Sequence, residues 1–158
     1  MNKIYLNNNS GKVSFEEIGI NKNLQNEINR TSFSGQITSR SLRETLLNIF
    51  CNHGYIKGFK IHGDHNLKIT GIKDNTGLSI FLGHYAGVYY EMTKLAYLKK
   101  EGIIDNANFI LPSKKLHKEF LKNANMATYE RISKQMSLFN NQFDIEINFL
   151  CIDINKQE

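Results

Sequence analysis

The chain of 158 residues has the length of one domain, so we expect residues 1–158 to form a single folded unit. Apolar residues make up 41% of the sequence and charged residues 22%, and this ordinary globular composition excludes a disordered protein. No apolar stretch approaches the roughly 20 residues that a membrane span needs, and residues 1–10 lack the apolar segment of a signal peptide. We therefore expect a soluble, cytoplasmic protein that does not contact a membrane.

The first predicted element is a helix that begins at Ser14, because Ser14 and Glu17 have the spacing of a capping box. A second helix is predicted to be capped by Ser41, with Glu44 three residues later, and to end at Gly54. Both segments carry apolar residues at helical spacing, so each is expected to bury one face.

The pattern then changes to alternating β-branched and aromatic residues, which is typical of strands. Three antiparallel strands are predicted at 55–62, 67–73 and 78–82, joined by turns at 62–65 and 74–77. The remaining predicted elements are a helix at 88–101, a buried strand at 106–111, one or two helices within 113–138 and a last strand at 143–154. This order predicts an α/β fold with a mixed central sheet flanked by helices on both faces.

The net charge of +5 is concentrated in one segment, between Pro112 and Lys134. Its cations outnumber its anions, Glu119 and Glu130, and they are Lys114, Lys115, Lys118, Lys122, Arg131 and Lys134. Such a segment favours an anionic partner, although a solvated helix surface explains it equally well.

Within this series, the α-β-β-β-α-β order resembles the core of the restriction-endonuclease-like PD-(D/E)XK superfamily. The stretch at residues 69–86, ITGIKDNTGLSIFLGHYA, is similar to the catalytic hairpin of the BamHI/BglII branch. Members of that branch carry a strand with an Asp, a short turn, and then Gly-Val-Glu-Val-Gln-Phe-Gly. Further similarity lies at 88–91, 102–105, 110–116 and 125–131, so the resemblance covers roughly residues 24 to 154.

The resemblance implies a catalytic centre whose residues are absent here. In the family, an Asp on the first hairpin strand and an acid on the second hold a divalent metal, and a Lys or Gln two residues later positions the attacking water. The corresponding positions are Thr70, Ser79 and Phe81. Two hydroxyls and a phenyl ring do not supply the anionic oxygens that a hard cation needs, so the aligned centre is not intact.

Other acids are candidates to replace the missing ones. Glu91 is the foremost, because some nucleases of this superfamily carry their acid on the helix after the hairpin; its ordinary interpretation is an exposed helix position. Asp74, and Asp64 between His62 and His65, are lesser metal-ligand candidates, and both also suit a turn. Mg²⁺ is expected as a cofactor if the protein is a nuclease, and no cofactor is expected if it is inactive.

We favour a protein that binds double-stranded DNA, resembles a type II restriction endonuclease and has lost cleavage. Arg40 and Arg43 are predicted to contact bases, because a guanidinium matches the edge of guanine. Phosphate contacts are predicted for Lys114, Lys115, Lys118, Lys122 and Arg131, with Lys134 in support.

Two alternatives stay open at this point. One is an active Mg²⁺-dependent, site-specific deoxyribonuclease with a rearranged metal site, formed by Glu91 with Asp64 or Asp74. The other is a dimeric interaction or regulatory module that pairs with itself or with an active nuclease. Its aromatic surface would come from Tyr85, Tyr89, Tyr90 and Tyr97.

Overall fold

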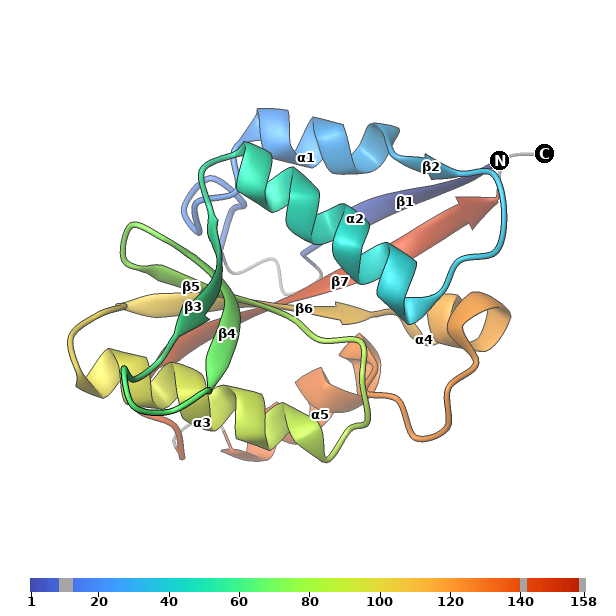
Figure 1. Ribbon diagram of the computed structural model, residues 1–158. Coiled ribbons are helices and arrows are strands. Elements are labelled where there is room, and N and C mark those ends of the chain that lie inside the picture. The colour runs from blue at the N-terminus through green and yellow to red at the C-terminus, as the bar shows by residue number, and fades with distance from the viewer. Residues whose placement is uncertain (9–12, 140–141, 157–158) are drawn as a thin grey trace.

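A mixed sheet forms the centre of the computed structural model, which describes residues 1–8, 13–139 and 142–156 (Figure 1). Within these residues the sheet has seven strands, in the order β2-β1-β7-β6-β5-β4-β3. The strands are β1 (Asn2–Asn7), β2 (Ser32–Phe33), β3 (Ile56–Lys60), β4 (Lys68–Lys73), β5 (Thr76–Ile80), β6 (Asn106–Pro112) and β7 (Glu146–Lys156). The helices are α1 (Lys22–Arg30), α2 (Ser39–Asn52), α3 (Gly87–Lys100), α4 (Lys114–Leu116), the π-helical turn η1 (His117–Leu121) and α5 (Tyr129–Phe139).

The strand directions confirm the predicted fold class. β3, β4 and β5 form an antiparallel meander, and α3 then connects β5 to β6, which runs parallel to β5. β7 is parallel to β6, while β1 and β2 complete the other edge in antiparallel orientation. None of the helices in the described part of the chain is long and apolar enough to cross a membrane.

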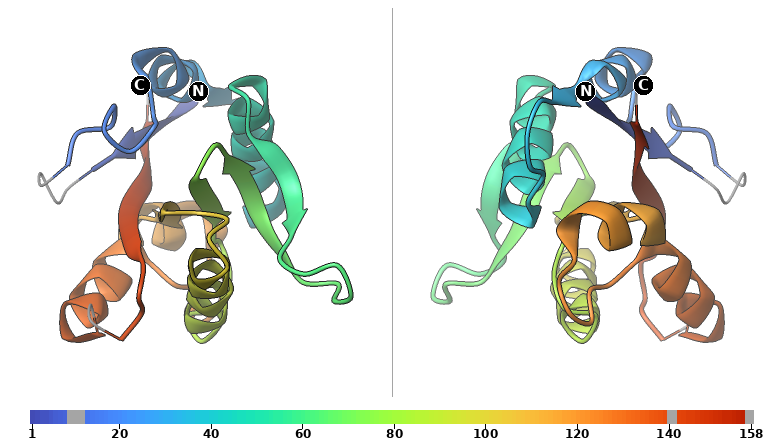
Figure 2. Two further views of the ribbon diagram at one scale, coloured as in Figure 1. Left: turned by 90° about the vertical axis from the view of Figure 1, so that its left-hand side faces the viewer. Right: turned by 90° about the vertical axis from the view of Figure 1, so that its right-hand side faces the viewer.

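Helices cover both faces of the sheet, as Figure 2 shows from two sides. α1 and α2 pack on one face, where Leu24 and Leu46 join the sheet residue Leu78 in a buried cluster. α3 and α5 pack on the opposite face, where Met92 and Ile132 are buried. Because successive side chains of a strand point to opposite faces, each strand contributes to both cores.

The alternation in β5 decides what faces the site described below. Leu78 and Ile80 belong to the core under α1 and α2. Ser79 and the following Phe81 lie on the other face, where Ser79 contacts α3 and Phe81 packs into the second core. Ser79 and Phe81, the positions that the hairpin resemblance predicts as catalytic in active nucleases, therefore lie on the face that α3 covers.

The N-terminal elements differ from the prediction. β1 is a strand that the sequence analysis missed, although Ile4 and Leu6 alternate inward as a strand requires. The predicted helix start at Ser14 is wrong, because Gly19 has φ 78 and so interrupts any helix there. The Ser14 hydroxyl accepts the Glu17 N–H only within a turn, and α1 begins later, capped by the Asn21 side chain.

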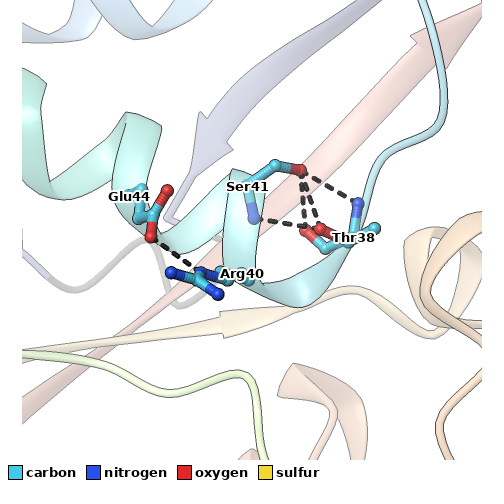
Figure 3. Close-up of polar contacts among 4 residues, drawn as sticks. All are labelled: Thr38, Arg40, Ser41 and Glu44. Carbon is cyan, nitrogen blue, oxygen red and sulfur yellow. Dashed lines mark hydrogen bonds and ion pairs between the residues drawn. The ribbon is translucent and has the colours of Figure 1, made fainter.

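The start of α2 also differs in its capping residue. Thr38 is the N-cap, and its hydroxyl accepts the N–H of Ser41, while the Ser41 hydroxyl accepts the N–H of Thr38 at 3.0 Å (Figure 3). Ser41 is therefore the second member of a reciprocal capping box and not the cap itself. The predicted partner Glu44 forms an ion pair with Arg40 instead.

β1 and β7 are joined by a side-chain contact as well as by their ladder. The Tyr5 hydroxyl donates to Oδ2 of Asp153 at 2.9 Å, and the two residues are direct partners in register. Burial raises the pKa of Tyr5 to about 12, and the hydrogen bond to Asp153 and the charge of that carboxylate act in the same direction. Burial likewise raises the pKa of the Cys151 thiol on β7 to about 12.

Candidate nucleic-acid interface

The sheet divides between β4 and β5. The two strands pair from their connecting turn as far as Gly71 and Leu78. Beyond that point β4 continues along β3, while β5 continues along β6, so the β3–β4 hairpin turns away from the rest of the sheet (Figure 2). At the branch, the Thr70 hydroxyl accepts the main-chain N–H of Ile80 at 3.0 Å. A side chain thus completes the bonding where the main-chain ladder ends.

A cleft of about 830 Å³ opens at this branch, between α2, the β3–β4 hairpin and α3. Among the described residues that line it, Glu91 is the one acid. The cationic lining residues come from four elements, and they are Arg40, Arg43, Lys57, Lys68 and Lys94. The cleft is therefore a basic surface built around the branch point of the sheet.

The cleft brings together residues that the sequence analysis predicted for different roles. Arg40 and Arg43, the predicted base contacts, line it together with Thr70, Phe81 and Glu91. Ser79 lies beneath them, 1% exposed, and its hydroxyl donates to Oε2 of Glu91 at 3.4 Å. These residues span more than 50 positions of the sequence, and the fold places them around one branch point.

The arginines project from the first two turns of α2, three residues apart and so on the same side of the helix. The capping box of Thr38 and Ser41 defines where this helix begins (Figure 3), and the start of the helix determines where both arginines project from it. Arg40 Nε donates to Glu44 Oε1 at 3.0 Å, but both side chains are exposed. Such a surface ion pair contributes about 0–1 kcal/mol to stability, so an anionic ligand can displace Glu44 as the partner of Arg40.

Glu91 occupies a half-buried position in the cleft, so its interpretation as an exposed helix acid is wrong. Its carboxylate forms an ion pair with Lys94, one turn later on α3. Lys94 is 8% exposed, and its ammonium also donates to the main-chain oxygen of Lys68 at 2.6 Å and lies 5.3 Å from the ring centroid of Tyr90. These contacts offset the free-energy cost of removing the two charges from water.

Comparison with known proteins shows which solved structures share this architecture. No family model matches the sequence, and no curated protein matches it. Among solved structures, the chain is similar to the restriction endonuclease BglII complexed with a DNA 16-mer, with a TM-score of 0.66 and 12% identity over 99% of this chain and 79% of that chain. Free BglII gives a TM-score of 0.57 and 11% identity over 99% and 80% of the two chains. The fold is that of a restriction endonuclease.

The BglII-like fold confirms the core that the hairpin sequence predicted, from the β3–β4–β5 meander through α3 to β6. Thr70, Ser79 and Phe81 lie close to the branch of the sheet. The roles of these residues stay predictions.

The two turn acids lie apart from Glu91 in this BglII-like fold. Asp64 is in the β3–β4 connection, with its side chain 91% exposed and 4.0 Å from His62. Asp74 is exposed in the β4–β5 turn, where its φ of 50 suits a turn residue. Neither lines the cleft, and the described residues hold no group of three His, Cys, Asp or Glu side chains that suits a metal ion.

The basic segment after β6 lies outside the lining of the cleft. Its cations are on α4, the π-helical turn, the loop after it, and α5, namely Lys114, Lys115, Lys118, Lys122, Arg131 and Lys134. The Lys115 ammonium donates to the main-chain oxygen of Ile154, and the Arg131 guanidinium lies 3.7 Å from the ring centroid of Tyr85. The segment contacts two residues that line the cleft: Asn123 Nδ2 donates to Ser39 Oγ at the start of α2, and the Ala127 N–H donates to the main-chain oxygen of Gly83.

Lys57, Lys68 and Lys94 are the cleft cations that sequence reasoning missed. Each is separated by at least two residues from the next cation of its strand or helix, so no local run of charge marks it. Lys57 and Lys68 become neighbours of one cleft only through the antiparallel pairing of β3 and β4. The signal that would have found Lys57 and Lys68 is the paired register of the β3–β4 hairpin, which brings both strands to the same place.

Proposed function

We propose that this chain binds double-stranded DNA through the cleft and does not cleave it. The observation that carries the proposal is the set of four cations around the branch of a BglII-like sheet: Arg40, Arg43, Lys57 and Lys68. The solved neighbour with the TM-score of 0.66 is itself a complex with DNA, which supports duplex DNA as the ligand of this surface.

The physical basis of binding is neutralisation of phosphates by these cations. Arg43, Lys57 and Lys68 are exposed, so their charged groups reach a ligand without first being uncovered. Each phosphate that a cation neutralises releases condensed counterions, and the affinity therefore falls steeply as the salt concentration rises. Arg40 and Arg43 also suit a bidentate contact with a phosphate or a guanine edge, because the guanidinium presents two parallel donors.

The absence of cleavage is inferred from the donors at the branch. A metal-dependent nuclease needs anionic oxygens to hold Mg²⁺ and polarise the phosphate. Here the Thr70 hydroxyl bonds to Ile80, the Ser79 hydroxyl donates to Glu91, and the Glu91 carboxylate is neutralised by Lys94. Phe81 offers a ring in place of a group that can hold a proton. These residues do not fit a resident Mg²⁺.

The test is to incubate supercoiled plasmid with the purified protein in Mg²⁺, in Mn²⁺ and in EDTA on one gel. We expect intact plasmid with lowered mobility in all three conditions, and a shift that fades as salt rises. Nicked or linear plasmid that depends on the metal contradicts the inactive state, whereas unshifted plasmid contradicts DNA binding.

The second candidate is the Mg²⁺-dependent deoxyribonuclease, and the position of Glu91 in the cleft is the observation in its favour. Under that function the Glu91→Ala variant abolishes any cleavage seen with wild type.

The homodimer is a third proposal. Tyr90 on α3 is 53% exposed, while Tyr85, Tyr89 and Tyr97 are half-buried, so Tyr90 would carry the contact. Sedimentation of a dimer that Tyr90→Ala converts to monomer supports it.

A further inference from the structure

The Lys94 ammonium bridges the two sides of the divided sheet. On one side it donates to the main-chain oxygen of Lys68, two residues before Thr70 on β4. On the other it pairs with the Glu91 carboxylate, which accepts from Ser79 on β5. A single positive charge is thus held between oxygens at the branch of β4 and β5, at the floor of the basic cleft.

We propose that the Lys94 ammonium takes the electrostatic place of a divalent metal in this cleft, so that the protein binds DNA without any metal ion. The inference rests on the proposed DNA binding. The resemblance gives a metal the task of joining the acids of the two hairpin strands and facing the phosphate. In this chain an internal ammonium joins β4 and the Glu91 carboxylate at the same branch.

The charge balance at the cleft floor supports this substitution. Without Lys94, the Glu91 carboxylate would be half-buried and unpaired where a DNA phosphate is expected. Like charges brought together in a partly dehydrated site weaken binding, and an unpaired buried charge adds to that cost. With Lys94 in place the pair is neutral, and the exposed cations at the rim attract the phosphates unopposed.

Divalent cations should therefore leave the affinity of the wild-type protein unchanged. Removing only the ammonium should create a need for a cation, because Glu91 and a phosphate oxygen then offer the anionic ligands that Ca²⁺ binds. Removing both charges should abolish that need. These three behaviours separate a cation that replaces a metal from a lysine that merely contacts DNA.

The experiment is a fluorescence anisotropy titration of a labelled DNA duplex in EDTA and in CaCl₂ at constant ionic strength. It compares wild type, Lys94→Met, Glu91→Gln and the double variant, with Lys100→Met as the control, since Lys100 is an exposed cation of the same helix outside the cleft lining. For Lys94→Met we expect the affinity in EDTA to fall about tenfold or more and Ca²⁺ to restore most of it. Wild type, the double variant and Lys100→Met should bind equally in EDTA and Ca²⁺.

Each other outcome has a distinct meaning. A wild-type affinity that rises tenfold in Ca²⁺, or a Lys94→Met affinity that is unchanged in EDTA, overturns the role of Lys94. If Lys94→Met does not fold, Glu91→Gln decides: it should bind DNA more tightly than wild type in EDTA, since it frees the ammonium for the phosphate, and no gain overturns the inference. Wild type that binds no duplex in either buffer refutes the proposed function itself.

Discussion

The hydroxyl of Thr70 accepts the main-chain N–H of Ile80 at 3.0 Å, at the point where β4 and β5 separate. In an unbroken antiparallel pair a carbonyl would accept from that N–H. The side chain therefore stabilises the end of the ladder, at a position where the sequence resemblance predicts a catalytic Asp in active nucleases. Thr70 is 6% exposed, so water does not replace the contact readily.

Thr70→Val should destabilise the fold, because it keeps the shape of the side chain and leaves the Ile80 N–H without its acceptor. A buried polar group left unsatisfied costs about 1–3 kcal/mol in free energy of unfolding. Urea denaturation followed by circular dichroism measures the change. Thr70→Ser is the matched control, since it retains the hydroxyl, and equal losses in the two variants would show that the hydrogen bond contributes nothing.

Arg43→Ala should weaken DNA binding and reduce the dependence on salt, because Arg43 is an exposed cation of the cleft. Loss of one phosphate contact lowers the slope of log affinity against log salt concentration by about one. Loss of a base contact instead weakens binding by about 1–3 kcal/mol, and only for DNA of the preferred sequence. Lys118→Ala is the control from the basic segment outside the cleft. A larger effect of Lys118→Ala would move the interface to α4 and the π-helical turn.

Gly77→Ala should destabilise the fold by about 1–3 kcal/mol through overpacking between β5 and α3. A Cβ at Gly77 would lie 3.0 Å from Cδ2 of Leu95 and 3.1 Å from Cδ1 of Ile104. Gly35→Ala is the control, since its Cβ would meet no atom within 4 Å. Ile104→Val removes one of the crowded methyls, so the double variant with Gly77→Ala should lose less stability than the two single losses added together.

Alkaline pH should unfold the protein progressively, starting above pH 9. In the unfolded chain Tyr5 and Cys151 titrate near their ordinary pKa values of 10.0 and 9.0, whereas folding raises the pKa of each to about 12. The unfolded state therefore binds fewer protons between those values, so the free energy of unfolding decreases as pH rises through that window and is unaffected below it. The raised pKa values of Tyr55 and Tyr129 act in the same direction.

Urea titrations from neutral pH to about pH 11 test this dependence on proton release. The double variant Tyr5→Phe, Cys151→Ala removes two of the shifted groups, so its stability should decline less steeply with pH than that of wild type. Parallel curves for the two proteins would mean that these groups titrate alike in the folded and unfolded states.

The central elements were predictable because their signals are local. Alternating apolar residues and turn-forming residues mark β4, β5 and their connection, and helical spacing with Gly102 as a stop marks α3. The N-terminal region was not predictable from such local signals. The turn at Gly19 depends on a backbone conformation, and Ile4 and Leu6 are recognisable as residues of a strand only once β7 is known to pair with β1. Those strands are separated by most of the chain.

The candidate site was predictable in part. The hairpin resemblance identified the branch residues Thr70, Ser79 and Phe81, and arginines early in α2 suggested contacts from that helix. The sequence could not reveal that Glu91 faces Ser79 and Lys94 within a cleft, because that depends on how α3 is seated on β5. The cations near residue 114 are close together in the sequence, whereas the cleft cations are spread over four elements, α2, β3, β4 and α3.

The outer strand β3 presents an open edge beside the cleft, since β4 is its one neighbour in the sheet that the described residues form. Open edges invite pairing with a second chain, and exposed lysines and irregular backbone discourage it. β3 has both, with exposed Lys57 and Lys60 and with Gly58 at φ 62. Lys57, next to the exposed Ile56, therefore also protects this edge from pairing with another chain. A variant that neutralises it for a binding experiment should also become more prone to aggregate.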